Sequence, residues 1–185
     1  MVWLLTSEDE ESAIRELNDS SPRAKAIVGA TVLENRLTYA LSPLFPINGE
    51  TKKNLFKDTG PLGNFDTKSK VAYAIGIISK AALQDITKVV EIRNKFAHRL
   101  GISDFHHKDI RPIAMGLGLI ETHVRPLGEP DEIAKDIKLR LFEADREAHF
   151  ADPERRYLLT IRLIILGLHQ FPVGGPKPPP PQPLI

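Results

Sequence analysis

The segment 81–100 carries the longest uninterrupted helical periodicity in the chain, and this periodicity limits the possible folds more than any other feature. At about 100° per residue, its apolar side chains fall within roughly 80° of one helix face, which is centred on Arg93. These side chains belong to Leu83, Ile86, Val89, Val90, Phe96, Ala97 and Leu100. A buried guanidinium needs a carboxylate, a carbonyl group or a bound anion, because an unpaired buried charge costs several kcal/mol. The segment therefore predicts a core helix and a specific partner for Arg93.

Helical periodicity also dominates the rest of the chain. Apolar residues at spacings of three and four predict a long helix over 22–41, and a last helix over 154–169 is apolar nearly all round. Further helices are expected over 8–17, 50–57, 109–121 and 131–146, and after a cap at Asp66 or Thr67. No segment alternates apolar and polar residues for long enough to predict a strand. The sequence therefore predicts an all-α fold, with a single helical bundle of about seven helices over residues 1–172.

Several residues indicate where these helices begin and end. We expect Ser21, Ser79 and Asp152 to cap the helices that follow them, because their side-chain oxygens can accept hydrogen bonds from free backbone N–H groups. Gly101 is expected to end the helix over 81–100 as a glycine with positive φ. The glycines of the turn at 60–64 are also expected to use their freedom to adopt positive φ.

Composition narrows the class of protein. The chain has 185 residues, enough for one domain with a sizeable core, and its formal net charge of +1 gives no overall attraction to nucleic acid or an anionic membrane. It contains no cysteine, which excludes disulfides, thiolate metal sites and a cysteine nucleophile. No apolar run has the length of a membrane span and no signal peptide is recognisable, so we expect a cytoplasmic protein without a membrane contact. The proline-rich segment 173–185 is expected to be a disordered tail.

Between positions 60 and 98 the chain carries a series of motifs, namely Gly60-Pro61-Leu62, Phe65, Lys68, Ala72, Gly76-Ile77-Ile78, Asp85-Ile86, Ile92-Arg93-Asn94 and Phe96-Ala97-His98. These motifs resemble the mannitol operon repressor family. The resemblance implies an all-helical homodimer that acts as a transcriptional regulator. The sequence shows no helix-turn-helix with a basic recognition helix, no zinc-ligand spacing and no basic arm. We therefore expect regulation through a protein partner, without catalysis, cofactor or metal, and we do not expect direct DNA binding.

The motif formed by Arg93, Asn94 and His98 is also similar to the signature of HEPN domains, which are helical and usually dimeric. Many HEPN domains are metal-independent ribonucleases of toxin–antitoxin or defence systems. This resemblance implies that Arg93 holds the scissile phosphate, that His98 takes part in proton transfer and that Asn94 helps to orient them. RNA would be a partner only under this alternative, in which the chain is a ribonuclease toxin or an inactive relative.

A structural role for the same residues is a further interpretation. Glu34, beside the apolar face of the 22–41 helix, is the candidate partner for Arg93 in a buried ion pair. His98 can bond the last carbonyl groups of its helix, where the helix dipole favours a histidine. On an unbroken helix His98 lies about 140° from Arg93, so a shared catalytic site requires an early helix end, a bent arginine side chain or a second chain. The sequence leaves these interpretations open.

Overall fold

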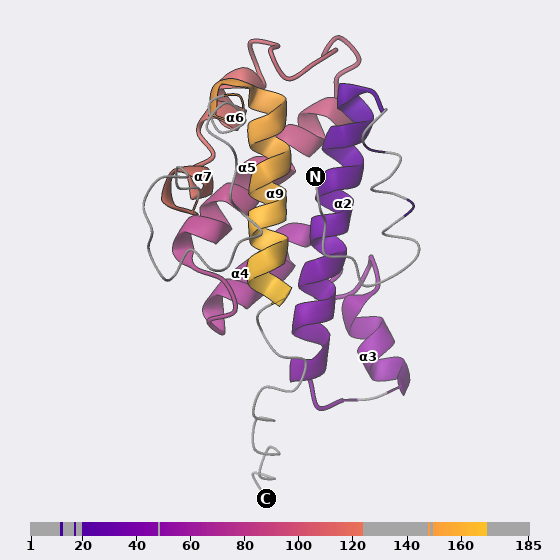
Figure 1. The fold of residues 1–185 in the computed structure, drawn as a ribbon. Helices are drawn as coiled ribbons and strands as arrows, with labels where there is room; N and C mark the ends of the chain where they lie inside the picture. Colours follow the sequence, from indigo (N-terminus) through magenta and orange to yellow (C-terminus); the bar gives the residue numbers. More distant parts are fainter. Residues whose placement is uncertain are drawn as a thin grey trace, which may run out of the picture.

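The computed structural model describes residues 20–47, 49–123 and 150–169, together with positions 12, 17 and 148. Within these residues every regular element is helical, which confirms the predicted all-α class (Figure 1). The elements are α2 (Pro22–Leu41), the short 3-10 helix η1 (Ser42–Leu44), α3 (Gly49–Phe56), α4 (Phe65–Ala74), α5 (Lys80–His98), α6 (Arg111–Met115), α7 (Leu119–His123) and α9 (Pro153–His169). The helix expected over 131–146, most of that over 8–17, and the proline-rich segment with its boundary at 172–173 lie outside the described residues.

The core forms where α2, α5 and α9 pack together. Figure 1 shows α9 beside α2 along much of its length, and α5 contacts both helices. Gly29 on α2 allows this close approach, because a Cβ atom there would lie only 3.2 Å from Ile161 Cδ1 of α9. Three buried rings continue the core, with centroids 4.9 Å apart for Phe96 and Phe105 and 5.1 Å apart for Phe105 and Tyr157. The last helix is therefore central to the core, as its apolar sequence predicts.

Side-chain caps begin the main helices at the predicted places. The hydroxyl of Ser21 accepts a hydrogen bond from Ala24 N–H at 3.3 Å, and that of Ser79 accepts from Ala82 N–H at 3.1 Å. Asp152 Oδ1 accepts from Arg155 N–H at 2.8 Å at the start of α9. These bonds satisfy backbone donors that have no partner inside the helix.

The cap of α4 differs from the prediction. Asn64, not Asp66 or Thr67, precedes the helix, and its Oδ1 atom accepts from Asp66 N–H at 2.8 Å. An asparagine side chain caps as well as an aspartate, and the helix, which begins two or three residues earlier than predicted, places Phe65 in the core. The early start therefore combines a cap with the burial of an aromatic ring.

Two other predicted boundaries are wrong. The expected helix over 109–121 is split into α6 and α7, because the chain turns at Gly116 and resumes helical geometry only at Leu119. Gly101 does not end α5 with positive φ, since Arg99 caps the helix in an extended conformation with φ −117° and ψ 104°. In the described part of the chain, positive φ occurs only at Gly49 and Gly76.

The turn at 60–63 needs glycine for a different reason from the one predicted. A Cβ atom on Gly60 would lie 2.1 Å from Asn54 O, and one on Gly63 would lie 2.2 Å from Lys57 O. The chain passes directly against the last carbonyl groups of α3, and Leu62 N–H donates to Leu55 O at 2.9 Å. Close approach of two backbone segments, and not positive φ, therefore fixes both glycines.

None of the helices that the structure describes combines the length and the apolar character needed to cross a bilayer.

Candidate functional site

The buried face of α5 is rotated from the face that the sequence predicts. Ala82, Asp85, Ile86, Val89, Ile92 and Phe96 are the buried residues of α5. The helix faces the core near Val89, whereas Arg93 is half-buried at its rim and Leu100, beyond the helix end, is 90% exposed. The cause is tertiary, because α6, α7 and α9 pack against α5 and bury the side that carries Asp85 and Ile92. The expected central position of Arg93 is therefore corrected to an edge position.

Arg93 and its candidate partner Glu34 have different neighbours. Arg93 Nη1 donates to Asn94 Oδ1 at 2.9 Å. Glu34 Oε1 accepts a hydrogen bond from Lys68 Nζ at 2.9 Å, and the lysine side chain is buried against it. No ion pair among the described residues joins Glu34 to Arg93. The structure thus brings Arg93 together with Asn94, and it places Glu34 in an ion pair between α2 and α4.

His98 is the last residue of α5 and is exposed. The helix is continuous through this residue, so it does not end near Phe96 as a compact Arg93–His98 site would require. The two side chains remain about 140° apart around the helix axis. Among the hydrogen bonds of the described residues, none uses the His98 side chain. A site that combines Arg93 and His98 would therefore need a bent arginine side chain or a contribution from a second chain.

Arg23 organises this end of α5. Its guanidinium donates to four backbone carbonyl groups. One is Phe96 O, and the others are Arg99 O and Leu100 O, at 3.2 Å each, and Ile102 O, at 2.8 Å. These are carbonyls at and beyond the last turn of α5, which lack partners inside the helix. The single arginine thus fixes the backbone next to His98. No sequence pattern predicts it, because the contact joins positions that are far apart in the chain.

These contacts also show how the helices are oriented. Arg23, at the start of α2, bonds to the end of α5, so α2 and α5 are antiparallel. Lys68 on α4 pairs with Glu34 in the second half of α2, and α4 leads through the turn at Gly76 directly into α5. The C-terminal ends of α2 and α4 and the N-terminal end of α5 therefore share one end of the molecule.

This end exposes large apolar side chains. Tyr39 is 57% exposed, Tyr73 is 44% exposed and Ile75 is 50% exposed. We call the end of the molecule at which these three residues lie the apolar end. Leu100, which is also highly exposed, follows the opposite end of α5. Tyrosines are frequent in the energetically important part of protein interfaces, so the apolar end is a candidate contact surface.

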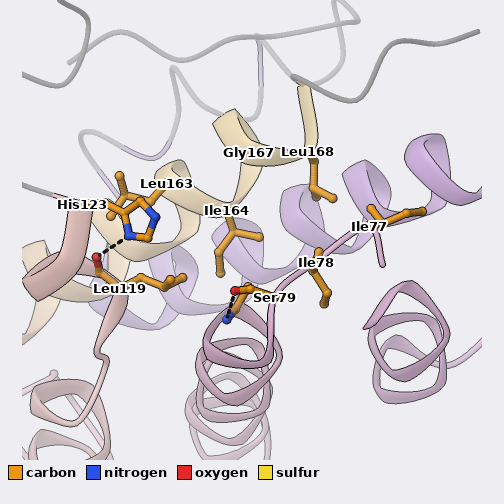
Figure 2. A pocket seen from close by; sticks show the side chains of 10 residues that line it. Ile77, Ile78, Ser79, Leu119, His123, Leu163, Ile164, Gly167 and Leu168 are labelled. Atoms are coloured by element: carbon orange, nitrogen blue, oxygen red, sulfur yellow. Dashed lines mark hydrogen bonds between the residues drawn. The ribbon is translucent and has the colours of Figure 1, made fainter. Parts of the chain in front are cut away.

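A pocket of about 260 Å³ opens between the α4–α5 turn, α7 and the end of α9 (Figure 2). Its walls are aliphatic apart from two polar residues, Ser79 and His123. Figure 2 shows His123 on one side of the pocket and Ile77 on the other. His123 Nδ1 lies 2.6 Å from Thr122 Oγ1 and 3.1 Å from Leu119 O, so this nitrogen already has partners within α7. The pocket therefore favours apolar groups.

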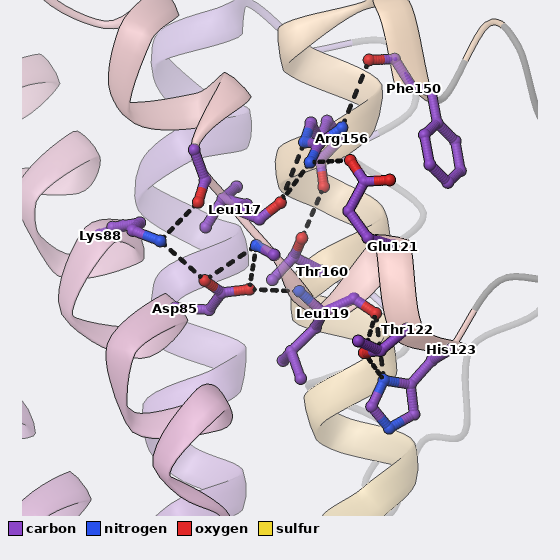
Figure 3. A network of polar contacts seen from close by, with 12 residues as sticks. Asp85, Lys88, Leu117, Leu119, Glu121, Thr122, His123, Phe150, Arg156 and Thr160 are labelled. Atoms are coloured by element: carbon purple, nitrogen blue, oxygen red, sulfur yellow. Dashed lines mark hydrogen bonds and ion pairs between the residues drawn. The ribbon is translucent and has the colours of Figure 1, made fainter.

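A buried carboxylate joins α5 to the segment before α7 (Figure 3). Asp85 is 2% exposed, and its Oδ2 atom accepts from the N–H groups of Gly118 and Leu119 at 2.8 Å each. Lys88 Nζ lies 3.1 Å from Asp85 Oδ1 and also donates to Gly116 O. The carboxylate is fully paired, so it serves as a structural cap for α7.

Arg156 holds the same segment from α9 (Figure 3). Its Nε atom donates to Leu117 O at 3.1 Å, and Nη2 donates to Glu121 Oε1 at 2.6 Å. Asp85 and Arg156 thus fix residues 116–121 from two sides. Both charges are buried and satisfied, and their role is to join helices.

The loop 103–109 holds two histidines and two aspartates, His106, His107, Asp104 and Asp109. His107 Nδ1 accepts from Asp109 N–H at 3.2 Å, and His106 Nε2 lies 3.4 Å from Asp152. The hydrogen bond from Ser103 lowers the pKa of the Asp104 carboxyl group. Within the described ranges, no three histidine, aspartate or glutamate side chains come together as a metal site. These groups pair with local neighbours in the loop and with the cap of α9.

The sequence profile described as mannitol repressor matches residues 31–153, more than half of the chain. The chain belongs to the mannitol repressor family. This confirms the resemblance that the motifs between positions 60 and 98 predict. A search among curated proteins finds no match.

Two solved structures share the fold of this mannitol repressor family member. One is a chain of the MtlR–HPr complex from Escherichia coli, with a TM-score of 0.59 and 17% identity over 88% of this chain and 99% of that chain. The other is a possible transcriptional regulator, YggD, from Shigella flexneri, with a TM-score of 0.60 and 17% identity over 89% of this chain and 99% of that chain. At 17% identity, the likeness to these two structures shows that this chain shares their fold.

Proposed function

We propose that this protein is a transcriptional regulator of the mannitol-repressor type that acts, without catalysis, by binding a protein partner. Its family membership over residues 31–153 carries the proposal. A related chain of the same fold has been crystallised as a complex of MtlR with HPr. We propose a partner of the HPr kind for this chain as well.

The apolar end is the surface that we assign to this partner. Tyr39, Tyr73 and Ile75 expose apolar area that the described part of the chain leaves uncovered. Aromatic side chains of this kind contribute most of the binding energy in many interfaces. Tyr39 belongs to α2, Tyr73 and Ile75 lie at the end of α4, and the two helices pack together.

Titration calorimetry of the full chain with HPr from the source organism tests both parts of the proposal. We expect saturable binding, and we expect Tyr39→Ala with Tyr73→Ala to weaken it by about tenfold or more. Leu100→Ala is the matched control, because it removes an exposed apolar side chain at the opposite end of α5. If the wild-type chain does not bind HPr, the proposed partner is wrong. If Leu100→Ala weakens binding as much as the tyrosine variant does, the proposed surface is wrong.

A regulator that depends on a partner should not recognise DNA alone. We expect the purified chain to leave mannitol-operon promoter DNA unshifted in an electrophoretic assay. A specific shift by this chain alone contradicts the partner-dependent mode.

The HEPN-like ribonuclease is a second candidate, supported by one observation. Arg93 is only half-buried, is held by Asn94 and lies on the same helix as an exposed His98. Because the two residues lie about 140° apart around the helix, catalysis would require a bent arginine side chain or a second chain. If this candidate is right, the wild-type chain cleaves RNA without metal, and both Arg93→Ala and His98→Ala abolish cleavage while the fold persists.

We also propose that the protein is a cytoplasmic homodimer, as the family resemblance and the apolar helix faces suggest. Light scattering at micromolar concentration measures the mass directly. A monomer mass under these conditions contradicts the dimer.

A further inference from the structure

The segment 49–63, which contains α3 and the turn before α4, buries almost none of its side chains. We call it the α3 segment. No residue of α3 is buried, and Leu62 is the one buried residue between positions 49 and 63. The Leu62 side chain lies outside the hydrophobic cluster that α2, α4, α5 and α9 share. The α3 segment therefore lies on the surface of the helical bundle and adds little to its core.

The polar bonds of the α3 segment are internal to it. Within the ranges that the structure describes, no hydrogen bond or ion pair joins the segment to another part of the chain. Leu62 N–H donates to Leu55 O at 2.9 Å, and Gly60 N–H donates to Lys57 O at 2.7 Å. Both bonds link the turn to the last part of α3 or the residue that follows it. The segment therefore satisfies its own backbone groups without help from the bundle.

The helices of the bundle are held by a different set of contacts. Lys68 of α4 pairs with α2, Lys25 of α2 pairs with α9, and Asp85 of α5 bonds to the backbone at the start of α7. Such links must break, and several buried side chains must be exposed, before one of these helices can separate. Regions with few buried apolar contacts open at a lower free energy than the core of the same protein. The α3 segment has the features of such a region.

We propose that the α3 segment is a separate cooperative unit, which unfolds locally while the bundle of α2, α4, α5 and α9 stays folded. Isolated helices as short as the eight residues of α3 are marginal in water, so α3 loses its structure once it leaves the bundle. The bundle does not need the segment for its own hydrogen bonds, and it loses only the apolar contacts of a few side chains.

Local unfolding uncovers apolar groups at one end of the molecule. Phe56 of α3 packs against the core beside Phe45, with ring centroids 5.6 Å apart. Figure 1 shows α3 beside the C-terminal half of α2, the half that contains Tyr39. The closed α3 segment is thus a cover, and its opening adds apolar surface at the apolar end.

Native-state hydrogen exchange of the full-length chain, at urea concentrations below the unfolding transition, tests the proposal. The reporters are the hydrogen-bonded amides of Lys57, Gly60 and Leu62. We expect them to exchange together, and about a hundredfold or more faster than the buried amides of α5, because local opening costs less than global unfolding. Their opening free energy should also fall less steeply with urea, since this slope follows the surface that becomes exposed.

Two leucine variants separate local from global opening. Leu62→Ala removes the buried side chain of the α3 segment, so the reporter amides should exchange about tenfold or more faster than in the wild type. Leu83→Ala is the matched substitution on α5, where the side chain packs against the main cluster. Its contacts persist while the α3 segment is open, so it should accelerate the amides of α5 and leave the reporter amides unchanged.

Three results overturn the proposal. Reporter amides with the same exchange rate and urea dependence as those of α5 mean that the segment opens only when the whole chain unfolds. Equal acceleration of both sets of amides by Leu83→Ala means the same. Unrelated exchange rates for Lys57 and Leu62 mean that the segment frays in parts and is not a cooperative unit.

Discussion

Gly63 stands where the backbone of one segment touches the carbonyl groups of another. A Cβ atom there would lie 2.2 Å from Lys57 O and 2.5 Å from Asp58 O, both backbone atoms that cannot move aside cheaply. We expect Gly63→Ala to destabilise the fold by about 1–3 kcal/mol, the usual range for overpacking. Gly101→Ala is the control, because its Cβ atom meets nothing within 4 Å. Urea denaturation of the two variants checks this, and equal midpoints would show that the turn relaxes freely.

Tyr157 is fully buried, and its hydroxyl donates to Ala26 O at 2.7 Å. Burial raises the pKa of Tyr157, and the positive charge of Arg93 offsets part of that rise. The folded state therefore holds the phenol proton above the pH near 10 at which an unfolded tyrosine loses it. Its contribution to stability is complete below about pH 10 and falls as the pH rises further.

The measurement is the urea midpoint as a function of pH, compared between wild type and Tyr157→Phe. We expect the wild type to lose stability above about pH 10 more steeply than the variant, which has no phenol to ionise. Parallel profiles for the two proteins contradict the assignment of this pH dependence to Tyr157.

The success of prediction at single residues depends on how local the interaction is. Ser79 and Asp152 are predictable as caps because each bonds to a backbone group three residues away. The burial of Arg93 is not predictable in the same way, because α6, α7 and α9 decide which side of α5 is covered. Gly63 is predictable as part of a turn, but its expected positive φ is wrong, because the need for glycine comes from contact with carbonyl groups just after α3.

At the scale of elements, Arg23 fixes where α5 ends. Its guanidinium bonds to carbonyl groups of Phe96, Arg99, Leu100 and Ile102. We expect Arg23→Ala to lower the free energy of unfolding by about 1.5–3 kcal/mol, as for hydrogen bonds from a charged group. The amides of 99–102 should also exchange faster with solvent, which mass spectrometry detects. Arg155→Ala is the control, an exposed arginine at the start of α9, and similar exchange in both variants contradicts the role of Arg23.

Asp85 joins α5 to α7 in a comparable way. Asp85→Ala leaves the N–H groups of Gly118 and Leu119 and the charge of Lys88 without their partner. Breaking such a buried charge pair costs about 3–5 kcal/mol, so we expect a large fall in the urea midpoint. Asp66→Asn is the comparison, because the exposed pair of Asp66 with Lys70 contributes little. A loss at Asp85 as small as that at Asp66 argues against the structural role.

Helix existence is predictable from periodicity, whereas interruptions are not. The helices α2, α5 and α9 follow the spacing of apolar residues closely. The break between α6 and α7 depends on Asp85 and Arg156, which bind the backbone of the turn from two other helices. Gly116 and Gly118 weaken a helix there, but the partners that stabilise the turn are 30 or more positions away in sequence.

For the whole molecule, the two surfaces of interest lie at opposite ends of one helix. The N-terminal end of α5 adjoins the pocket and the apolar end with Tyr39 and Tyr73. The C-terminal end of α5 carries Arg93 and His98, and Arg23 of α2 bonds to the backbone that follows this end. The candidate contact surface and the HEPN-like motif therefore share no residues, and their effects should be separable. The family resemblance is predictable from sequence motifs, but this separation requires the packing of α2 against α5.

This separation leads to a prediction for the complete protein. Within the part of the chain that the structure describes, Arg93 makes one side-chain hydrogen bond, to Asn94, so Arg93→Ala should cost only about 0.5–1.5 kcal/mol. Because His98 is exposed at the far end of α5, Arg93→Ala and His98→Ala should leave HPr binding unchanged, while Tyr39→Ala with Tyr73→Ala weakens it. Calorimetry, thermal melts and an RNA-cleavage assay on the same preparations check this. Loss of HPr binding in Arg93→Ala would place the partner at the motif instead, and RNA cleavage that both motif variants abolish would make the site catalytic.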